Sequence, residues 1–270
     1  MVGHRNARVR SASMNPSLDG RAVLVTGGGS GIGRATALEV AARGGAVAVV
    51  DRDVAGVDET VALVTSAGGR AVPTPADVSD EDAVREAVTR AVGELGRLDG
   101  AVTAAGIFDG PDLQPLADVT LATFNRTLAV NLTGTFLAMK FALPHLERAE
   151  GEPRGSIVTI ASTAGIRGHG FGSGYTASKG GVVALTRLAA VQYGPRGVRV
   201  NCICPGAVDT PMAAGAWDSD ESRARMKRDV PLGVVAEAGD IGSVAGFLLS
   251  PDAHHLTGQV IAVDGGTTVT

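Results

Sequence analysis

The sequence predicts an α/β protein: a single Rossmann-type domain whose doubly wound parallel sheet, of about seven strands, carries helices on both faces. Short apolar segments alternate with helical patterns along the chain, which is typical of parallel sheets with crossover helices. The first apolar segment runs into a glycine-rich turn and then into a helix. The 270 residues are enough for one large core, and no linker divides them.

Composition narrows the function classes. The net charge of −4 argues against nucleic acid as the main partner. No apolar run approaches the ~20 residues of a membrane helix. Residues 1–17 are polar and basic and lack the apolar core of a secretion signal, so we expect a disordered tail before a domain at 18–270. Cys202 and Cys204 are expected to point to opposite faces of a strand without a mutual disulfide, in a reducing cytoplasm.

The first unit is strand, turn, helix. RAVLVT at 21–26 is a short buried strand, GGGSGIG follows at 27–33, and a helical pattern runs over 34–43. Glycines let the backbone approach a pyrophosphate, and the helix N-terminus offers free N–H groups and a positive dipole end. A glycine-rich run alone is weak evidence, but in this context it indicates dinucleotide binding.

A second apolar strand at 46–50 ends in Asp51, which follows Gly33 by 18 residues, where a ribose-binding carboxylate belongs. A carboxylate accepts hydrogen bonds from the ribose 2′-OH and repels a 2′-phosphate, so we expect NAD rather than NADP. Ser30 agrees, because a basic residue there favours NADP, whereas the adjacent Arg52 could meet a phosphate. The alternative is that Asp51 only caps the next helix.

The alternation continues with helix, strand, helix and strand at 53–67, 71–75, 80–95 and 98–103. Ser79, a good N-cap residue, is expected to open the helix at 80–95. Small residues at 104–106 suit the close approach of a ligand. A long helical stretch at 121–146 contains Asn131, a poor residue for a helix interior, which marks a local kink or binds water and side chains.

The next strand, at 155–161, ends just before Ser162, and a helix is expected at 173–193. In that helix Tyr175 and Lys179 are four residues apart and share one face. A fixed ammonium favours a phenolate, and lowering a Tyr pKa from ~10 to about 7 takes roughly 4 kcal/mol. Such a pair is common by chance, and the phosphate-binding turn makes the catalytic interpretation the stronger one.

The remaining elements are a strand at 198–203, a helix at 237–249 and a strand at 259–263. The mixed, charged stretch at 207–231 is either a mobile lid or a plain surface excursion. Ligands of such sheets bind beyond the carboxyl ends of the strands. The residues that follow strands should therefore line one cleft: Gly27, Asp51, Ala104, Ser162 and Pro205.

In this order the motifs resemble the short-chain dehydrogenase/reductase family over about residues 19–270. The motifs are Thr26-Gly27-x-x-x-Gly31-x-Gly33, Asp77-Val78, Ala104-Ala105-Gly106, Asn131, Ser162, Tyr175-x-x-x-Lys179 and Pro205-Gly206. The resemblance implies that Tyr175 is the general acid/base and that Ser162 holds and polarises the substrate oxygen. Lys179 would bind the nicotinamide ribose and lower the pKa of Tyr175, and Asn131 would anchor a water in the proton relay.

The resemblance also implies a cofactor site. Asp51 would take the adenosine ribose, Asp77 and Val78 would flank the adenine, and Val208 and Thr210 would meet the nicotinamide amide. The full set expected to bind NAD is Gly27, Ser30, Gly31, Ile32, Gly33, Asp51, Arg52, Asp77, Val78, Ala104, Gly106, Tyr175, Lys179, Pro205, Gly206, Val208 and Thr210. No metal is expected.

This sequence departs from the family at 103–106. Family members usually have Asn-Asn-Ala-Gly there, and this chain has Thr-Ala-Ala-Gly. We expect cofactor binding to persist, because the contacts of that segment are mostly through backbone. A side-chain link that braces the central strand is expected to be lost.

The function expected is an NAD-dependent transfer of hydride between a secondary alcohol, or a ketone, and the nicotinamide. Alternatives are a 3-oxoacyl-type ketone reductase, a catalytically silent NAD-sensing or scaffold protein, and a lyase or epimerase with bound NAD. Substrate contacts are expected at Ser162, His169, Tyr175, Met212 and Trp217. The resemblance further implies a homo-oligomer, a tetramer or dimer built on the long helices and the C-terminal strand.

Overall fold

The computed structural model describes residues 18–108, 110–148, 155–168, 172–216 and 219–270. The expected tail at 1–17 lies outside them. Seven parallel strands form one sheet in the order β3-β2-β1-β4-β5-β6-β9. These strands are β1 (Ala22–Thr26), β2 (Ala46–Val50), β3 (Arg70–Pro73), β4 (Gly100–Thr103), β5 (Gly155–Ile160), β6 (Val198–Pro205) and β9 (Val260–Val263). The predicted fold class is confirmed.

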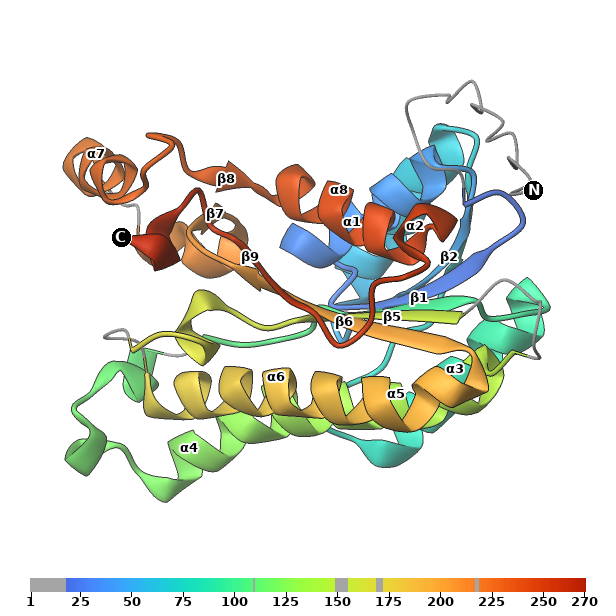
Figure 1. The fold of residues 1–270 in the computed structure, drawn as a ribbon, viewed down its shortest axis with the longest axis horizontal. Coiled ribbons are helices and arrows are strands. Elements are labelled where there is room, and N and C mark those ends of the chain that lie inside the picture. Colours follow the sequence, from blue (N-terminus) through green and yellow to red (C-terminus); the bar gives the residue numbers. More distant parts are fainter. Residues whose placement is uncertain (1–17, 109, 149–154, 169–171, 217–218) are drawn as a thin grey trace, which may run out of the picture.

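Helices cover both faces of the sheet (Figure 1). On one face lie α1 (Gly31–Ala42), α2 (Val54–Ser66) and α8 (Ala238–Leu249). On the other lie α3 (Glu81–Leu95), α4 (Leu121–Leu128), α5 (Gly134–Leu146) and α6 (Ser173–Tyr193). The stretch at 207–231 contains α7 (Asp220–Asp229) and β7 (Val208–Asp209), and β7 pairs with β8 (Ala236–Glu237) apart from the main sheet.

The two largest apolar clusters lie on opposite faces of the sheet because side chains alternate along each strand. Leu24 of β1 belongs to the core that α3 and α5 cover, and its neighbours Val23 and Val25 belong to the core that α1 and α8 cover. Strands buried on both faces read as nearly continuous apolar runs, as RAVLVT does. Because helices cover both faces of these strands, we expect a ligand site at the strand ends.

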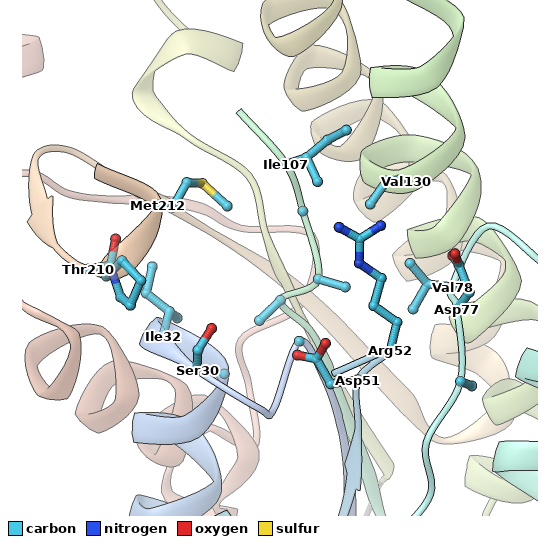
Figure 2. Close-up of a pocket in the computed structure, with 18 residues that line it drawn as sticks. Ser30, Ile32, Asp51, Arg52, Asp77, Val78, Ile107, Val130, Thr210 and Met212 are labelled. Carbon is cyan, nitrogen blue, oxygen red and sulfur yellow. The ribbon is translucent and has the colours of Figure 1, made fainter. Parts of the chain in front are cut away.

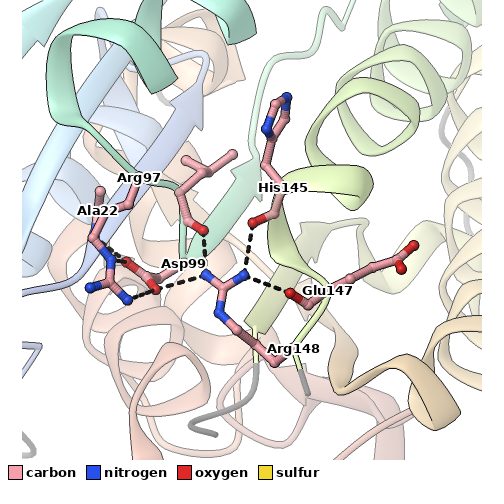
Figure 3. Close-up of polar contacts among 7 residues, drawn as sticks. Ala22, Arg97, Asp99, His145, Glu147 and Arg148 are labelled. Atoms are coloured by element: carbon pink, nitrogen blue, oxygen red, sulfur yellow. Dashed lines mark hydrogen bonds and ion pairs between the residues drawn. The ribbon is translucent and has the colours of Figure 1, made fainter.

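The amino end of the sheet is held by a buried carboxylate (Figure 3). Asp99 is 4% exposed and accepts hydrogen bonds from the Ala22 N–H at 3.0 Å, from Arg97 at 2.7 Å and from Arg148 at 2.9 Å. Burial acts to raise the pKa of Asp99, but the hydrogen bonds from these three groups lower it below the usual value. The cluster ties the start of β1 to the residues just after α5.

Two details differ from the sequence analysis. The expected helix at 121–146 is interrupted by a π-helical turn, Ala129–Thr133, which contains Asn131. The N-cap of α3 is Asp80 and not Ser79, because the Asp80 carboxylate accepts from the backbone of Asp82 and Ala83. Asx side chains cap as well as serine does, so residue type alone did not separate the two neighbours.

The expectation that Cys202 and Cys204 point to opposite faces is wrong. Residues two apart on a strand share a face, and both thiols belong to one apolar cluster, with their Sγ atoms 3.9 Å apart. Both are buried and free.

Within the described residues, no helix combines the length and the apolar character that crossing a bilayer requires.

Candidate active site

A cavity of about 260 Å³ opens at the carboxyl ends of β1, β2 and β4 (Figure 2). Its lining includes many of the residues expected to bind the cofactor: Gly27, Ser30, Gly31, Ile32, Gly33, Asp51, Arg52, Asp77, Val78, Ala104, Gly106 and Thr210. Met212, expected to contact substrate, also lines it. Side chains from sequence-distant segments thus meet at one edge of the sheet, as the strand order requires.

The glycine-rich turn is shaped for a bound phosphate. A Cβ on Gly33 would lie 2.0 Å from the Gly27 carbonyl oxygen, and Gly27 itself has φ +70°, so neither position accepts a side chain. Ser30, the N-cap of α1, makes no side-chain capping hydrogen bond. The first N–H groups of a helix have no acceptor within it, so this N-terminus suits an anion such as a pyrophosphate. The residues present therefore fit a dinucleotide.

Asp51 lies at the far side of this turn. Its Oδ2 accepts from the Gly29 N–H at 3.1 Å, and its Oδ1 accepts from the Asp53 N–H at 3.1 Å. The contact with the Asp53 N–H fits the alternative in which Asp51 caps the start of the next helix. It still leaves the Asp51 carboxylate on the cavity wall. Figure 2 shows Arg52 reaching into the cavity between Asp51 and Val130. The carboxylates of Asp51 and Asp77 and the guanidinium of Arg52 therefore line the same cavity.

The candidate acid/base lies on α6. Tyr175 is half-buried, and the Lys179 ammonium is 5.6 Å from the centre of its ring. Burial raises the pKa of Tyr175, and a hydrogen bond with Ser162 acts to lower it. The phenol is therefore protonated at neutral pH. Lys179 is not among the causes of that shift.

Lys179 is buried, and its Nζ donates to the Ile160 carbonyl oxygen at 3.0 Å. Burial lowers the pKa of Lys179 to about 8, while Cys202 and Cys204 act to raise it. A Cβ on Gly106 would lie 3.6 Å from this Nζ and 3.3 Å from Asn131 Oδ1. Gly106, which lines the cavity, therefore lies against the Lys179 and Asn131 side chains, although those two side chains do not line the cavity themselves.

The hydroxyl of Ser162 is oriented by its own turn. It accepts from the Ala164 N–H at 3.1 Å. With that lone pair engaged, its hydrogen can donate to the Tyr175 oxygen or to an oxygen held beside it. Ser162 therefore places a donor next to the phenol.

Asn131 connects three segments from the π-helical turn. Its Oδ1 accepts from the Ile107 N–H at 2.7 Å, and its Nδ2 donates to the Ile107 carbonyl oxygen at 3.0 Å and to Ser178 Oγ at 3.2 Å. The Ser178 hydroxyl in turn donates to the Tyr175 carbonyl oxygen at 2.7 Å. Asn131 thus links the segment after β4 to the helix that carries Tyr175.

Other expected site residues lie away from the cavity wall. Pro205 is the last residue of β6, Gly206 packs on Asp264 and Val208 is buried in β7. His169 and Trp217 lie outside the described residues. Five lining residues are outside the sets expected to bind cofactor or substrate: Ala76, Ala105, Ile107, Val130 and Pro211. Ala76 and Pro211 adjoin predicted residues, and no motif marks Val130.

The described residues hold no group of three His, Cys, Asp or Glu side chains that could ligate a metal.

Comparison with known proteins gives consistent matches over nearly the whole chain. The family model described as Enoyl-(Acyl carrier protein) reductase matches residues 27–268. Levodione reductase of Leifsonia aquatica is 41% identical over 254 residues, which cover 91% of this chain and 93% of that protein. Cis-4-hydroxycyclohexanecarboxylate dehydrogenase of Sinomonas cyclohexanicum is 41% identical over 249 residues, which cover 92% and 96%.

A solved structure agrees. That of a short-chain type dehydrogenase/reductase from Mycobacterium ulcerans superimposes with a TM-score of 0.87 at 35% identity, covering 94% of this chain and 91% of that one.

Proposed function

The chain belongs to the short-chain dehydrogenase/reductase family, and from this premise we propose that it is an NAD-dependent dehydrogenase of cyclic secondary alcohols. Its relatives are oxidoreductases of alcohols and ketones. The observation that carries the proposal is that Gly106, in the wall of a dinucleotide-shaped cavity, lies against the Lys179 side chain, which is beside Tyr175.

Tyr175 is the acid/base of this reaction. Its phenolate takes the proton of the alcohol, and in the reverse direction its phenol returns that proton. NAD, when bound, supplies the hydride acceptor. Because burial raises the pKa of Tyr175, the phenolate needs nearby positive charge to form at neutral pH.

Ser162 and Lys179 supply the electrostatic support. Ser162 donates to the oxygen that becomes a carbonyl, and a donor of this kind is worth about 2.7–4 kcal/mol. The pKa of Lys179, at about 8, leaves most of this ammonium protonated at pH 7. Its buried charge then favours the Tyr175 phenolate and can hold a ribose hydroxyl. Asn131 hydrogen-bonds the backbone of Ile107 and the side-chain hydroxyl of Ser178, the residue before Lys179.

The preference for NAD rests on Asp51. Its carboxylate lies on the cavity wall and would repel a 2′-phosphate. Arg52 lines the same space and partly offsets that repulsion, so we propose a preference for NAD and not an exclusive use of it.

The proposed substrate class comes from a relative and from the site walls. The Sinomonas enzyme is named for a hydroxycyclohexane acid. In this chain the aromatic ring of Phe108 packs edge-on against Tyr175, with centroids 5.0 Å apart, and Met212 and Ile107 line the cavity. An apolar wall beside the acid/base favours a compact ring that carries one secondary hydroxyl.

We propose a homo-oligomer built on α5 and α6. These helices leave an apolar groove of about 560 Å³, lined by Leu132, Thr133, Phe136, Gly181, Ala184, Leu185 and Leu188. Phe136 is 47% exposed and Leu188 52% exposed. Contiguous apolar surface of this kind marks protein interfaces.

The test is the change in nicotinamide absorbance with NAD and with NADP against cyclohexanol, cyclic diols, hydroxysteroids, sugar alcohols and a 3-oxoacyl thioester. We expect turnover of a cyclic alcohol that is faster with NAD. Faster reduction of the thioester with NADPH would favour the 3-oxoacyl reductase. No absorbance change with any substrate of the panel, together with intact NADH binding, would favour the NAD-sensing protein. Conversion of a substrate without a net change in nicotinamide would favour a lyase or epimerase.

A further inference from the structure

We propose that Asp112 is a positioning residue for catalysis: it fixes the N-terminus of α6, and with it Tyr175, to the segment that follows β4. The proposal rests on the function of Tyr175 proposed above. Asp112 lies in a 3-10 turn, Gly110–Leu113, more than sixty residues before Tyr175 in the sequence. No motif in the sequence singles it out.

Asp112 acts as a cap supplied from a distance. Its Oδ1 accepts from the Gly174 N–H at 2.8 Å, and its Oδ2 accepts from the Tyr175 N–H at 2.7 Å. The residue preceding α6, Gly172, provides no side-chain cap. The side chain of Asp112 thus satisfies two N–H groups that the helix leaves without acceptors, one of them belonging to Tyr175 itself.

The carboxylate of Asp112 is buried, and two glycines leave the space that it occupies. Asp112 is 0% exposed, although Leu113 beside it is exposed. A Cβ on Gly172 would lie 2.3 Å from Asp112 Oδ2, and one on Gly174 would lie 3.3 Å from Oδ1. Gly172 has ordinary φ and ψ values of −55° and 149°, so its backbone does not require glycine. The space for the carboxylate is the physical reason for glycine at that position.

Two further contacts join the same segment to Tyr175. Phe108 packs against the Tyr175 ring. Asn131 holds Ile107 by both its N–H and its carbonyl, and reaches Tyr175 through Ser178. The Tyr175 backbone is therefore held from both sides, by Asp112 at its N–H and by Ser178 at its carbonyl oxygen.

The consequence for catalysis follows from geometry. A misplacement of about 1 Å at a reacting group can cost about 100-fold in rate. Asp112→Asn keeps one acceptor oxygen and turns an NH₂ group toward the second N–H, so the two donors face each other. The first turn of α6 must then shift, and the Tyr175 oxygen moves relative to Ser162.

The first experiment compares Asp112→Asn with Asp80→Asn. Asp80 also accepts from two N–H groups, at α3, but it does so with one oxygen, Oδ1, at 2.9 and 3.0 Å, and it is exposed. We expect kcat to fall about 10- to 100-fold in Asp112→Asn, with the Kd of NADH within twofold of wild type. The primary isotope effect on kcat, measured with cyclohexanol deuterated at the carbinol carbon, should rise. Asp80→Asn keeps the one oxygen that accepts both hydrogen bonds, so it should leave kcat and the isotope effect unchanged.

The second experiment does not depend on Asp112→Asn folding. Gly172→Ala displaces the carboxylate, and Gly110→Ala, where a Cβ meets nothing within 4 Å, is the control in the same segment. We expect the kcat loss and the larger isotope effect in Gly172→Ala only. Wild-type kcat in folded Asp112→Asn or in Gly172→Ala would overturn the proposal. Tyr175→Phe separates the two claims: if it retains activity, the proposed function itself fails.

Discussion

At the scale of single residues, we propose that Asp51 selects NAD over NADP at the adenosine ribose. Asp51→Ala removes the carboxylate from a wall that still carries Arg52. We expect the ratio of kcat/KM with NAD to kcat/KM with NADP to fall by about 10-fold or more, which is about 1.4 kcal/mol. Asp53→Ala is the control, because that exposed neighbour makes no capping hydrogen bond. An unchanged ratio in Asp51→Ala would mean that another group reads the ribose.

Lys179 gives the protein a stability that depends on pH. Burial lowers its pKa to about 8, from an ordinary value of 10.5, so between these pH values the unfolded chain binds more protons at this group. Stability therefore rises with pH across this window, and is lost as pH falls back through the folded pKa. We expect cofactor-free wild type to gain on the order of 3 kcal/mol relative to Lys179→Met between pH 8 and 10.5 in urea unfolding. A constant difference would contradict the burial argument.

The residues that could be predicted are those with local signals. Tyr175 and Lys179 share a helix face, and Gly27 and Gly33 lie in one turn. Asp112 could not be predicted, because its partners are N–H groups more than sixty residues away and any residue except proline has one. Cys202 and Cys204 were expected on opposite faces, but residues two apart on a strand share a face, and the structure shows both thiols on one face.

At the scale of elements, α6 begins and ends where its pattern predicts, at Ser173 and Tyr193. The stretch at 121–146 is instead broken by the π-helical turn, Ala129–Thr133. The local sequence marks Asn131 as unfavourable in a helix but does not show that Ile107 is its partner. A tertiary hydrogen bond therefore decides the local geometry, as is common for π-turns at functional sites.

Strands β4 and β5 allow a matched test of buried polar groups. Among the residues that the structure describes, the buried Thr103 Oγ1 has no hydrogen-bond partner, and its register neighbour Thr159 bonds Thr186 at 2.7 Å. Thr103→Val should be neutral or stabilising by up to about 1 kcal/mol, because no hydrogen bond is lost. Thr159→Val should destabilise by about 1–2 kcal/mol. Urea unfolding measures both, and an equal loss in the two variants would show that Thr103 does have a partner.

At the scale of the whole molecule, the alternation of strands and helices predicts the sheet and the edge where ligands bind. The strand order brings Gly27, Asp51 and Ala104 to one cavity, as expected. Ser162 and Pro205 were expected on the same wall but do not line it. Strand ends fix the rim of a cleft, whereas side-chain packing decides which rim residues reach the cavity itself.

The exposed groove between α5 and α6 leads to a prediction about assembly. Leu188→Glu places a charge in that groove, where burial without a partner is costly. We expect wild type to elute as a multiple of 27.1 kDa in light scattering and Leu188→Glu to shift toward 27.1 kDa. Val54→Glu, at a side chain of similar exposure on α2, 54% against 52%, should leave the mass unchanged. A monomeric wild type would contradict the oligomer.

The most direct test of the central claim is turnover by Tyr175→Phe with NAD and the fastest alcohol of the substrate panel, beside NADH binding by the same variant. Phenylalanine keeps the ring that packs on Phe108 and removes only the hydroxyl. We predict a loss of kcat of at least about 100-fold, with the Kd of NADH within twofold of wild type. Activity close to wild type in Tyr175→Phe would contradict the account, because the acid/base would then be another group.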